Sequence, residues 1–239
     1  MSPASSSRRR SRVSLVAALA LAFLCFGGGT RAEAASEAVP AAGYINWAQV
    51  AVRAKPDRQA QRIDVLTQFR PDFRPRVVLA LGVKRDKSGE PAWYRISLPG
   101  RPNGRTGWIP AASVDLKPIQ KEIVIDRSER TLELRNAGRV VLSTRIAVGA
   151  YGMETPLGRF YVVAKFRPTA PILGAFGFET SAYSKLSEWP GGGVVGIHGT
   201  NTPSLLGQAV SHGCIRVANE AILRLKDLVP VGTPITIVD

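Results

Sequence analysis

"GIHGTNTPSLLGQAVSHGCIRV", residues 196–217, contains both histidines of the 239-residue chain and the second of its two cysteines. Side chains used only to fill a core have no reason to gather in one stretch. In an extended segment residues i and i+2 face the same side, so His212 and Cys214 are predicted to face one pocket. Gly213 between them has no side chain, so only backbone separates the two residues. His198, at the end of a predicted strand, is the third member of this cluster.

These residue types suit nucleophilic catalysis by a thiol. The thiolate is the reactive form of cysteine, and an ordinary thiol has a pKa of about 8.5, so Cys214 needs a base or a cationic neighbour. A histidine brought into contact supplies it, and the Gly199 carbonyl is the nearest candidate in sequence to orient the His198 ring. Amides around Gly213 and Cys214 are candidates for stabilising the oxyanion that acyl transfer creates.

Two other interpretations compete with this one. Zinc binding by His198, His212 and Cys214 lacks the fourth ligand of a closed site, and the spacing fits no zinc-finger pattern. Core packing explains each of the three residues singly but not their clustering beside several glycines. Acyl transfer on a thiol explains them together.

The cluster also carries a resemblance to a known family. Residues 198–200 ("HGT") and 211–216 ("SHGCIR"), with Gly207 in the spacer, resemble the signature of the L,D-transpeptidase catalytic domain, the YkuD family. Upstream, "TPLGRF" (155–160) and "IVIDRSERTLELR" (123–135) are also similar to it. The resemblance extends over residues 121–239.

This resemblance implies a β-sandwich enzyme of the bacterial envelope that acts on peptidoglycan stem peptides. It implies that Cys214 is the nucleophile and His198 the general base, held by the carbonyl of Gly199, while His212 and Gly213 shape the pocket and the oxyanion site. The thiol would form a thioester and expel a D-amino acid. An amine would then attack, giving a 3→3 cross-link, attachment of an envelope protein, or D-amino acid exchange.

Alternatives to this outcome remain open. Water as acceptor would make the same site a carboxypeptidase or endopeptidase, and a decayed site would leave a non-catalytic wall-binding protein. The family resemblance implies neither a metal nor an organic cofactor.

Four further residues are candidates for binding substrate. Arg216 is expected either to hold a substrate carboxylate or to brace the loop. Ser211 is expected to act as a hydrogen-bonding residue of the substrate loop and not as a second nucleophile. Residues 164–193 are rich in Gly, Pro and aromatics, which predicts a loop over the groove. Tyr183 and Trp189 would line that groove or simply pack.

The segment before the catalytic domain predicts a second, smaller β domain. In residues 44–116, "VRAKPD" (52–57), "WYRI" (93–96) and "GWI" (107–109) resemble bacterial SH3-like domains, which implies a wall-binding or positioning module. A β-rich extension that packs on the next domain is the alternative. Residues 117–120 are the predicted linker.

The fold class predicted is mainly β. Short strand patterns separated by Gly and Pro predict strands at 49–57, 76–81, 92–98, 104–110, 121–126 and 234–238. The βαβ alternation of a Rossmann-type fold is absent from the pattern. The one predicted helix covers 219–229, with Asn219 as its cap and Pro230 after its end. The prediction is therefore an L,D-transpeptidase-like β-sandwich with one late helix, preceded by a small SH3-like β-barrel.

The first residues predict export to the periplasm or cell envelope. Residues 1–34 combine arginines, a 14-residue apolar run and a small-x-small site, the pattern of a signal peptide and too short for a stable membrane span. Its removal leaves Cys214 as the one cysteine and lowers the formal charge from +14 to +10, because the segment holds five arginines and Glu33. A flexible leader is predicted over 35–43. Basic charge alone does not predict a nucleic-acid partner in an exported chain without a nucleic-acid motif.

Overall fold

The computed structural model describes residues 40–188 and 191–239, all within one compact unit of the chain. The predicted signal peptide (1–34), residues 35–39 of the predicted leader, and Trp189 lie outside the described residues.

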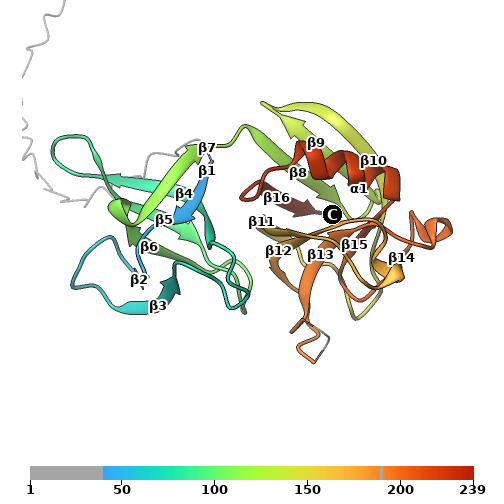
Figure 1. Cartoon of the computed structure of the whole chain (residues 1–239), viewed down its shortest axis with the longest axis horizontal. Coiled ribbons are helices and arrows are strands. Elements are labelled where there is room, and N and C mark those ends of the chain that lie inside the picture. Colours follow the sequence, from blue (N-terminus) through green and yellow to red (C-terminus); the bar gives the residue numbers. More distant parts are fainter. Residues whose placement is uncertain (1–39, 189–190) are drawn as a thin grey trace, which may run out of the picture. The chain divides into compact units, whose positions relative to one another are not determined.

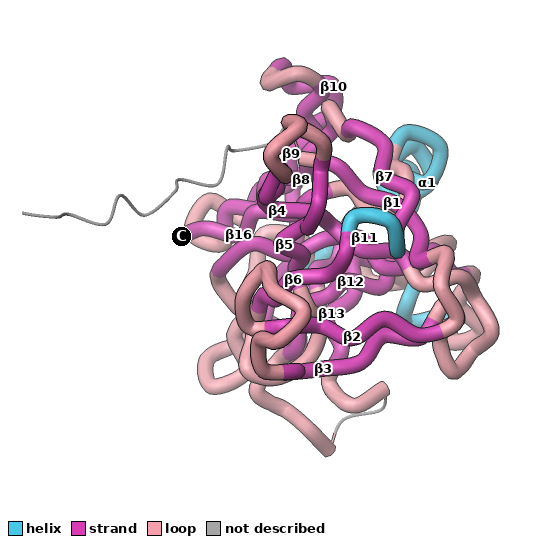
Figure 2. The backbone as a smooth tube through the Cα atoms, turned by 90° about the vertical axis from the view of Figure 1, so that its left-hand side faces the viewer, coloured by secondary structure: helices cyan, strands magenta, loops and turns pink. Residues whose placement is uncertain are grey.

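The N-terminal part is an antiparallel sheet that surrounds its own core (Figures 1 and 2). Its strands are β1 (Ala41–Ile45), β2 (Gln49–Arg53), β3 (Arg62–Thr67), β4 (Val77–Arg85), β5 (Pro91–Ser97), β6 (Thr106–Pro110) and β7 (Val114–Pro118), with the 3₁₀ turn η1 (Ala111–Ser113) before β7. They are hydrogen-bonded in the order β3-β2-β6-β5-β4-β1-β7. Buried side chains such as Val52, Ile96 and Ile109 fill the inside, because residues on alternate positions of each strand face one side.

The ends of this sheet differ from the predicted boundaries. β1 begins at Ala41, inside the segment predicted as a flexible leader, and pairs with both β4 and β7. β7 continues to Pro118 and β8 begins at Lys121, so the predicted linker shrinks to two residues. The strand predictions around 49–57, 76–81, 92–98 and 104–110 each match an observed strand, whereas the SH3-like identity stays a prediction.

The C-terminal part is a second, larger sheet. Its strands are β8 (Lys121–Asp126), β9 (Thr131–Asn136), β10 (Arg139–Gly149), β11 (Gly158–Phe166), β12 (Gly177–Tyr183), β13 (Val194–His198), β14 (Ala209–Ser211), β15 (Ile215–Val217) and β16 (Pro234–Val238). The order is β14-β10-β15-β13-β12-β11-β16-β8-β9, and β9 also pairs with β10. That last pairing closes the sheet around a core that includes Ile123, Leu132, Val162 and Ile197. The mainly β fold with a closed barrel confirms the predicted fold class.

β12 corrects one expectation. The Gly- and aromatic-rich segment predicted as a loop over the groove contains this strand, which is paired with β11 on one side and β13 on the other. Most of its side chains are buried on both faces, so the alternation of apolar and polar residues that marks a half-exposed strand is missing. The remaining turn η2 (Pro171–Leu173) lies before β12.

The late helix is confirmed as α1 (Asn219–Leu228), with Ile222 and Leu225 buried against the sheet and Pro230 beyond its end. Its predicted cap is wrong: Ala218 occupies the N-cap position, and Asn219 is the first helical residue. Among the described residues, no helix has both the length and the apolar character needed to cross a membrane. The turn η3 (Pro203–Leu205) lies in the spacer between the two histidines.

Candidate active site

Two parallel neighbouring strands, β13 and β15, bring the ends of the motif together. Ile197 pairs with Ile215 and His198 pairs with Arg216. The two isoleucines are fully buried in the core, so His198 and Arg216 point to the opposite face of the sheet. Cys214 immediately precedes β15 and is partly exposed. The spacer of the motif is thus the crossover between two adjacent strands.

Gly196 on β13 lies between the thiol and the imidazole. Its amide donates a hydrogen bond to Cys214 Sγ at 3.4 Å. A Cβ atom on Gly196 would lie 3.9 Å from Sγ and 3.7 Å from His198 Cδ2, so both side chains border the same small space. The structure therefore brings His198 and Cys214 together, as the sequence predicted.

The ring of His198 has a defined orientation and tautomer. The side chain is 3 % exposed, and Nδ1 lies 2.6 Å from the carbonyl oxygen of Gly199. A carbonyl oxygen only accepts hydrogen bonds, so Nδ1 must carry the proton. In the neutral ring Nε2 then has the free lone pair, and its bonded neighbour Cδ2 is the ring atom that borders the space over Gly196.

Both groups favour their neutral forms. Burial lowers the pKa of His198, and the positive charge of Arg216 lowers it further. The carbonyl groups of Gly199 and Leu173 raise this pKa, but their effect is smaller than that of burial. Burial raises the pKa of the Cys214 thiol, while the Gly196 amide and the Arg216 charge act in the other direction. Both shifts favour a neutral thiol and a neutral imidazole over an ion pair, because burial disfavours the charged form of each group.

The loop that carries the thiol is held by buried hydroxyl groups. Ser211 Oγ donates to the carbonyl of Cys214 at 2.6 Å and accepts from the amide of Gly213 at 3.1 Å. Ser211 is 1 % exposed and its hydroxyl is used within the loop, as expected of a hydrogen-bonding loop residue, whereas its part in substrate binding stays a prediction. The Gly213 amide is engaged there as well, which removes it as a donor to an oxyanion. Gly213 itself has φ +112°, a conformation that favours glycine.

Arg216 is the charged residue of the site. It is partly buried, and its Nε is the one buried side-chain polar atom without a hydrogen-bond partner in the described part of the chain. A buried donor without a partner costs free energy, so this atom is suited to an incoming acceptor.

The other predicted residues have different positions. His212 is partly buried in the loop between Ser211 and Gly213. Tyr183 ends β12; its backbone exchanges two hydrogen bonds with the Asn103 side chain (2.7 and 3.0 Å), and the Arg101 guanidinium lies 4.9 Å from its ring centre. These contacts favour a packing role for Tyr183, one of the two alternatives that the sequence left open.

Three residues of the site were missed by sequence reasoning. Gly196 lies within a predicted strand, where a glycine indicates that another group approaches the backbone closely. Thr155 belongs to "TPLGRF", yet its contact with the loop depends on tertiary structure. Asn219 was interpreted as a cap, whereas its side-chain oxygen accepts a hydrogen bond from the amide of Ala175 at 2.9 Å.

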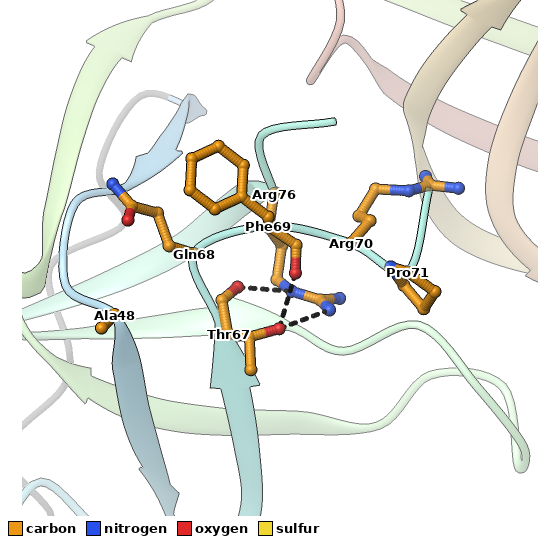
Figure 3. Close-up of a pocket in the computed structure, with 7 residues that line it drawn as sticks. All are labelled: Ala48, Thr67, Gln68, Phe69, Arg70, Pro71 and Arg76. Atoms are coloured by element: carbon orange, nitrogen blue, oxygen red, sulfur yellow. Dashed lines mark hydrogen bonds between the residues drawn. The ribbon is translucent and has the colours of Figure 1, made fainter. Parts of the chain in front are cut away.

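A metal site or a second hollow would be the alternative to this cluster. In residues 40–188 and 191–239, no group of three or more His, Cys, Asp or Glu side chains is placed to hold a metal ion. A separate hollow on the N-terminal sheet is lined by Ala48, Thr67, Gln68, Phe69, Arg70, Pro71 and Arg76 (Figure 3). There Arg76 donates to the carbonyl of Thr67 at 2.8 Å and to its hydroxyl at 3.2 Å. None of the predicted site residues lines this hollow.

Comparison with known proteins identifies the family of this chain. The L,D-transpeptidase catalytic domain family, YkuD, matches residues 120–237. The YkuD protein of Bacillus subtilis (strain 168) is 32 % identical over 180 residues, which cover 75 % of this chain and 96 % of that protein. The YqjB protein of the same organism is 46 % identical over 137 residues, 51 % of this chain and 73 % of the relative. The solved L,D-transpeptidase from Mycobacterium smegmatis is 17 % identical with a TM-score of 0.45, covering 69 % of this chain and 91 % of that one. The chain therefore belongs to the YkuD family of L,D-transpeptidases, a family of enzymes.

Proposed function

We propose that this protein is a cysteine-dependent L,D-transpeptidase that acts on peptidoglycan stem peptides. The observation that carries the proposal is the shared space over Gly196, which Cys214 Sγ and the Cδ2 edge of His198 border from two sides. The family supports a transpeptidase, and the geometry supports a thiol nucleophile with a histidine base.

The first half of the reaction uses the neutral pair. His198 Nε2 takes the proton from Cys214 as Sγ attacks the carbonyl that joins an L-centre to a D-residue. The bond from carbon to sulfur forms, and the carbonyl electrons move to oxygen. When the carbon–nitrogen bond breaks, the protonated His198 gives its proton to the leaving D-amino acid. A thioester remains on Cys214.

The second half reverses these roles. An amine attacks the thioester, His198 takes a proton from it, and Cys214 leaves as the thiol after the proton returns to sulfur. A stem-peptide amine gives a 3→3 cross-link, a lysine of an envelope protein gives attachment, and a D-amino acid gives exchange. With water as the acceptor the same steps give hydrolysis.

Two groups of the protein are assigned to bind negative charge. One binds the oxyanion that forms during the reaction, and the other binds a carboxylate that the substrate already carries. Because Ser211 Oγ accepts the Gly213 amide, we assign the oxyanion to the amide of Cys214. We assign a substrate carboxylate to Arg216, whose Nε is buried without a partner in the described residues and whose fork geometry suits a carboxylate.

We also infer that the protein is exported. Its proposed substrate lies in the cell wall, and residues 1–34 carry the pattern of a signal peptide. Deleting residues 1–34 should then retain the protein inside the cell, as fractionation and immunoblotting would measure. An unchanged distribution would contradict export through this segment.

The decisive experiment is mass spectrometry of the protein incubated with muropeptides that carry tetrapeptide stems, with Cys214→Ala in parallel. A thioester adduct on Cys214 together with a dimeric product, both absent in the variant, is the expected result. A tripeptide product without dimer would indicate hydrolysis. If folded wild-type protein binds the muropeptides but gives no adduct and no product, it is a wall-binding protein and the proposed function is wrong.

A further inference from the structure

Asn219 begins α1 but does not use its side chain to cap the helix. Ala218 holds the N-cap position, without a side-chain hydrogen bond, whereas asparagine is among the residues that stabilise that position best. Instead, the Oδ1 of Asn219 accepts the amide of Ala175, 44 positions earlier. A residue suited to capping is therefore used for a tertiary contact.

Two glycines make room for this amide oxygen. A Cβ atom on Gly199 would lie 2.2 Å from Asn219 Oδ1, and one on Gly174 would lie 2.4 Å from it. Real Cβ atoms do not approach other atoms so closely. Gly174 also has φ +66°, so its backbone conformation favours glycine as well. Asn219 is thus packed directly against the backbone of both segments.

These two segments carry the carbonyl groups that act on His198. The Gly199 carbonyl accepts the proton of Nδ1, and the carbonyl of Leu173, in the turn just before Gly174, also favours the protonated ring. The amide of Gly199 donates to Phe176 at 3.0 Å, which ties the same segments together from the other side. Any movement of Gly199 against the 173–175 turn would change the direction of both carbonyls.

From this geometry we propose that Asn219 is a positioning residue for the general base. It holds the Gly174–Ala175 turn against Gly199, which keeps the Gly199 carbonyl on Nδ1 of His198 and so leaves Nε2 as the base. The proposal rests on the proposed function, because it names what orients the base of that reaction. Asn219 acts through Gly199 and the turn at 174–175, so it is a positioning residue and not a catalytic one.

The test compares Asn219→Ala with the wild type and with Asn136→Ala, a matched change at an exposed asparagine of the β9–β10 hairpin. Nitrogen NMR of His198 in the free protein reports the tautomer without substrate. We expect wild type and Asn136→Ala to have the proton on Nδ1, and Asn219→Ala to show a mixture of tautomers. We also expect kcat to fall about 10- to 100-fold with KM within about twofold, since misplacing a catalytic group by an ångström costs rate and not binding.

A conservative variant gives a second signature. Asn219→Asp retains the oxygen that accepts the Ala175 amide, so it should restore the Nδ1 tautomer. Its negative charge near the imidazole should at the same time raise the pKa of His198 above that of the wild type. If Asn219→Ala does not fold, Asn219→Ser takes its place, because its shorter side chain suits a helix start but does not reach Ala175.

The results separate this proposal from the proposed function. A wild-type tautomer and wild-type kcat in the folded Ala or Ser variant would overturn the positioning role, whatever the enzyme's reaction. A wild-type protein without any turnover would overturn the proposed function, while the NMR comparison would still decide whether Asn219 orients His198.

Discussion

Thr155 Oγ1 donates a 2.9 Å hydrogen bond to the carbonyl of Gly213, although 58 positions separate the two residues. The same oxygen accepts the amide of Gly149 at 3.0 Å, at the end of β10. Thr155 is fully buried, so no water can replace these contacts. The loop in front of Cys214 is therefore supported by a hydroxyl from the connection between β10 and β11.

Replacing Thr155 by valine should destabilise the protein without changing its packing volume. The change leaves the Gly213 carbonyl and the Gly149 amide buried without partners, which we expect to lower the free energy of unfolding by about 2–4 kcal/mol. Urea unfolding followed by circular dichroism measures this. Thr106→Val, at an exposed threonine of β6, is the matched control and should change the value by less than about 0.5 kcal/mol. Equal effects of the two changes would contradict the proposed support.

Gly196→Ala should separate activity from stability. The new methyl group would meet the Phe178 carbonyl, His198 Cδ2 and Cys214 Sγ at 3.5–3.9 Å, ordinary contact distances, so the free energy of unfolding should change by less than about 1 kcal/mol. The methyl group would occupy the space that thiol and imidazole share, and kcat should fall at least about tenfold. Steady-state turnover of a tetrapeptide donor measures this. Full activity in the folded variant would show that the two groups do not react across that space.

The pH dependence of kcat/KM should reflect the lowered pKa of His198. The base must be neutral, and a lowered pKa keeps the ring neutral to more acidic pH, so the acid limb should have its midpoint below the ordinary histidine value of about 6.5. The pKa of the Cys214 thiol is raised, so the reactive thiolate should form only at more alkaline pH. The rate of alkylation by iodoacetamide should therefore reach its midpoint above about pH 8.5. A thiol midpoint below pH 7 would instead indicate a preformed thiolate–imidazolium pair.

Arg216→Gln should affect substrate binding more than the chemical step. Glutamine removes the positive charge and the fork of donors, so KM for a donor stem with a free carboxylate should rise about 10-fold or more, with a smaller change in kcat. A donor whose carboxylate is amidated should show no such difference between wild type and variant. If Arg216→Gln raises KM for the amidated donor as much as for the free acid, Arg216 braces the loop and does not bind the carboxylate.

The sequence by itself determined the family, the mainly β fold and the identity of the reactive groups. The pattern around His198 and Cys214 is local, and so are the alternating residues of β8 (Lys121–Asp126) and β16 (Pro234–Val238), which were predicted with the observed bounds. The helix at 219–228 was evident for the same reason, since its buried positions repeat every three to four residues and Pro230 follows. Such features depend on neighbours in sequence, which a reader of the sequence can see.

Tertiary structure decided which partner each polar group takes. β12 was not recognised because both of its faces are buried between β11 and β13. Ser211 and Gly213 suited the substrate site by position, yet the hydrogen bond between them engages both within the loop. Asn219 suited a helix cap, but the glycines at 174 and 199 bring a distant amide within reach of its oxygen. A buried polar group without a hydrogen-bond partner costs free energy, so a polar side chain with two possible partners bonds to the buried one. Which groups are buried is decided by the folded chain and not by the local sequence.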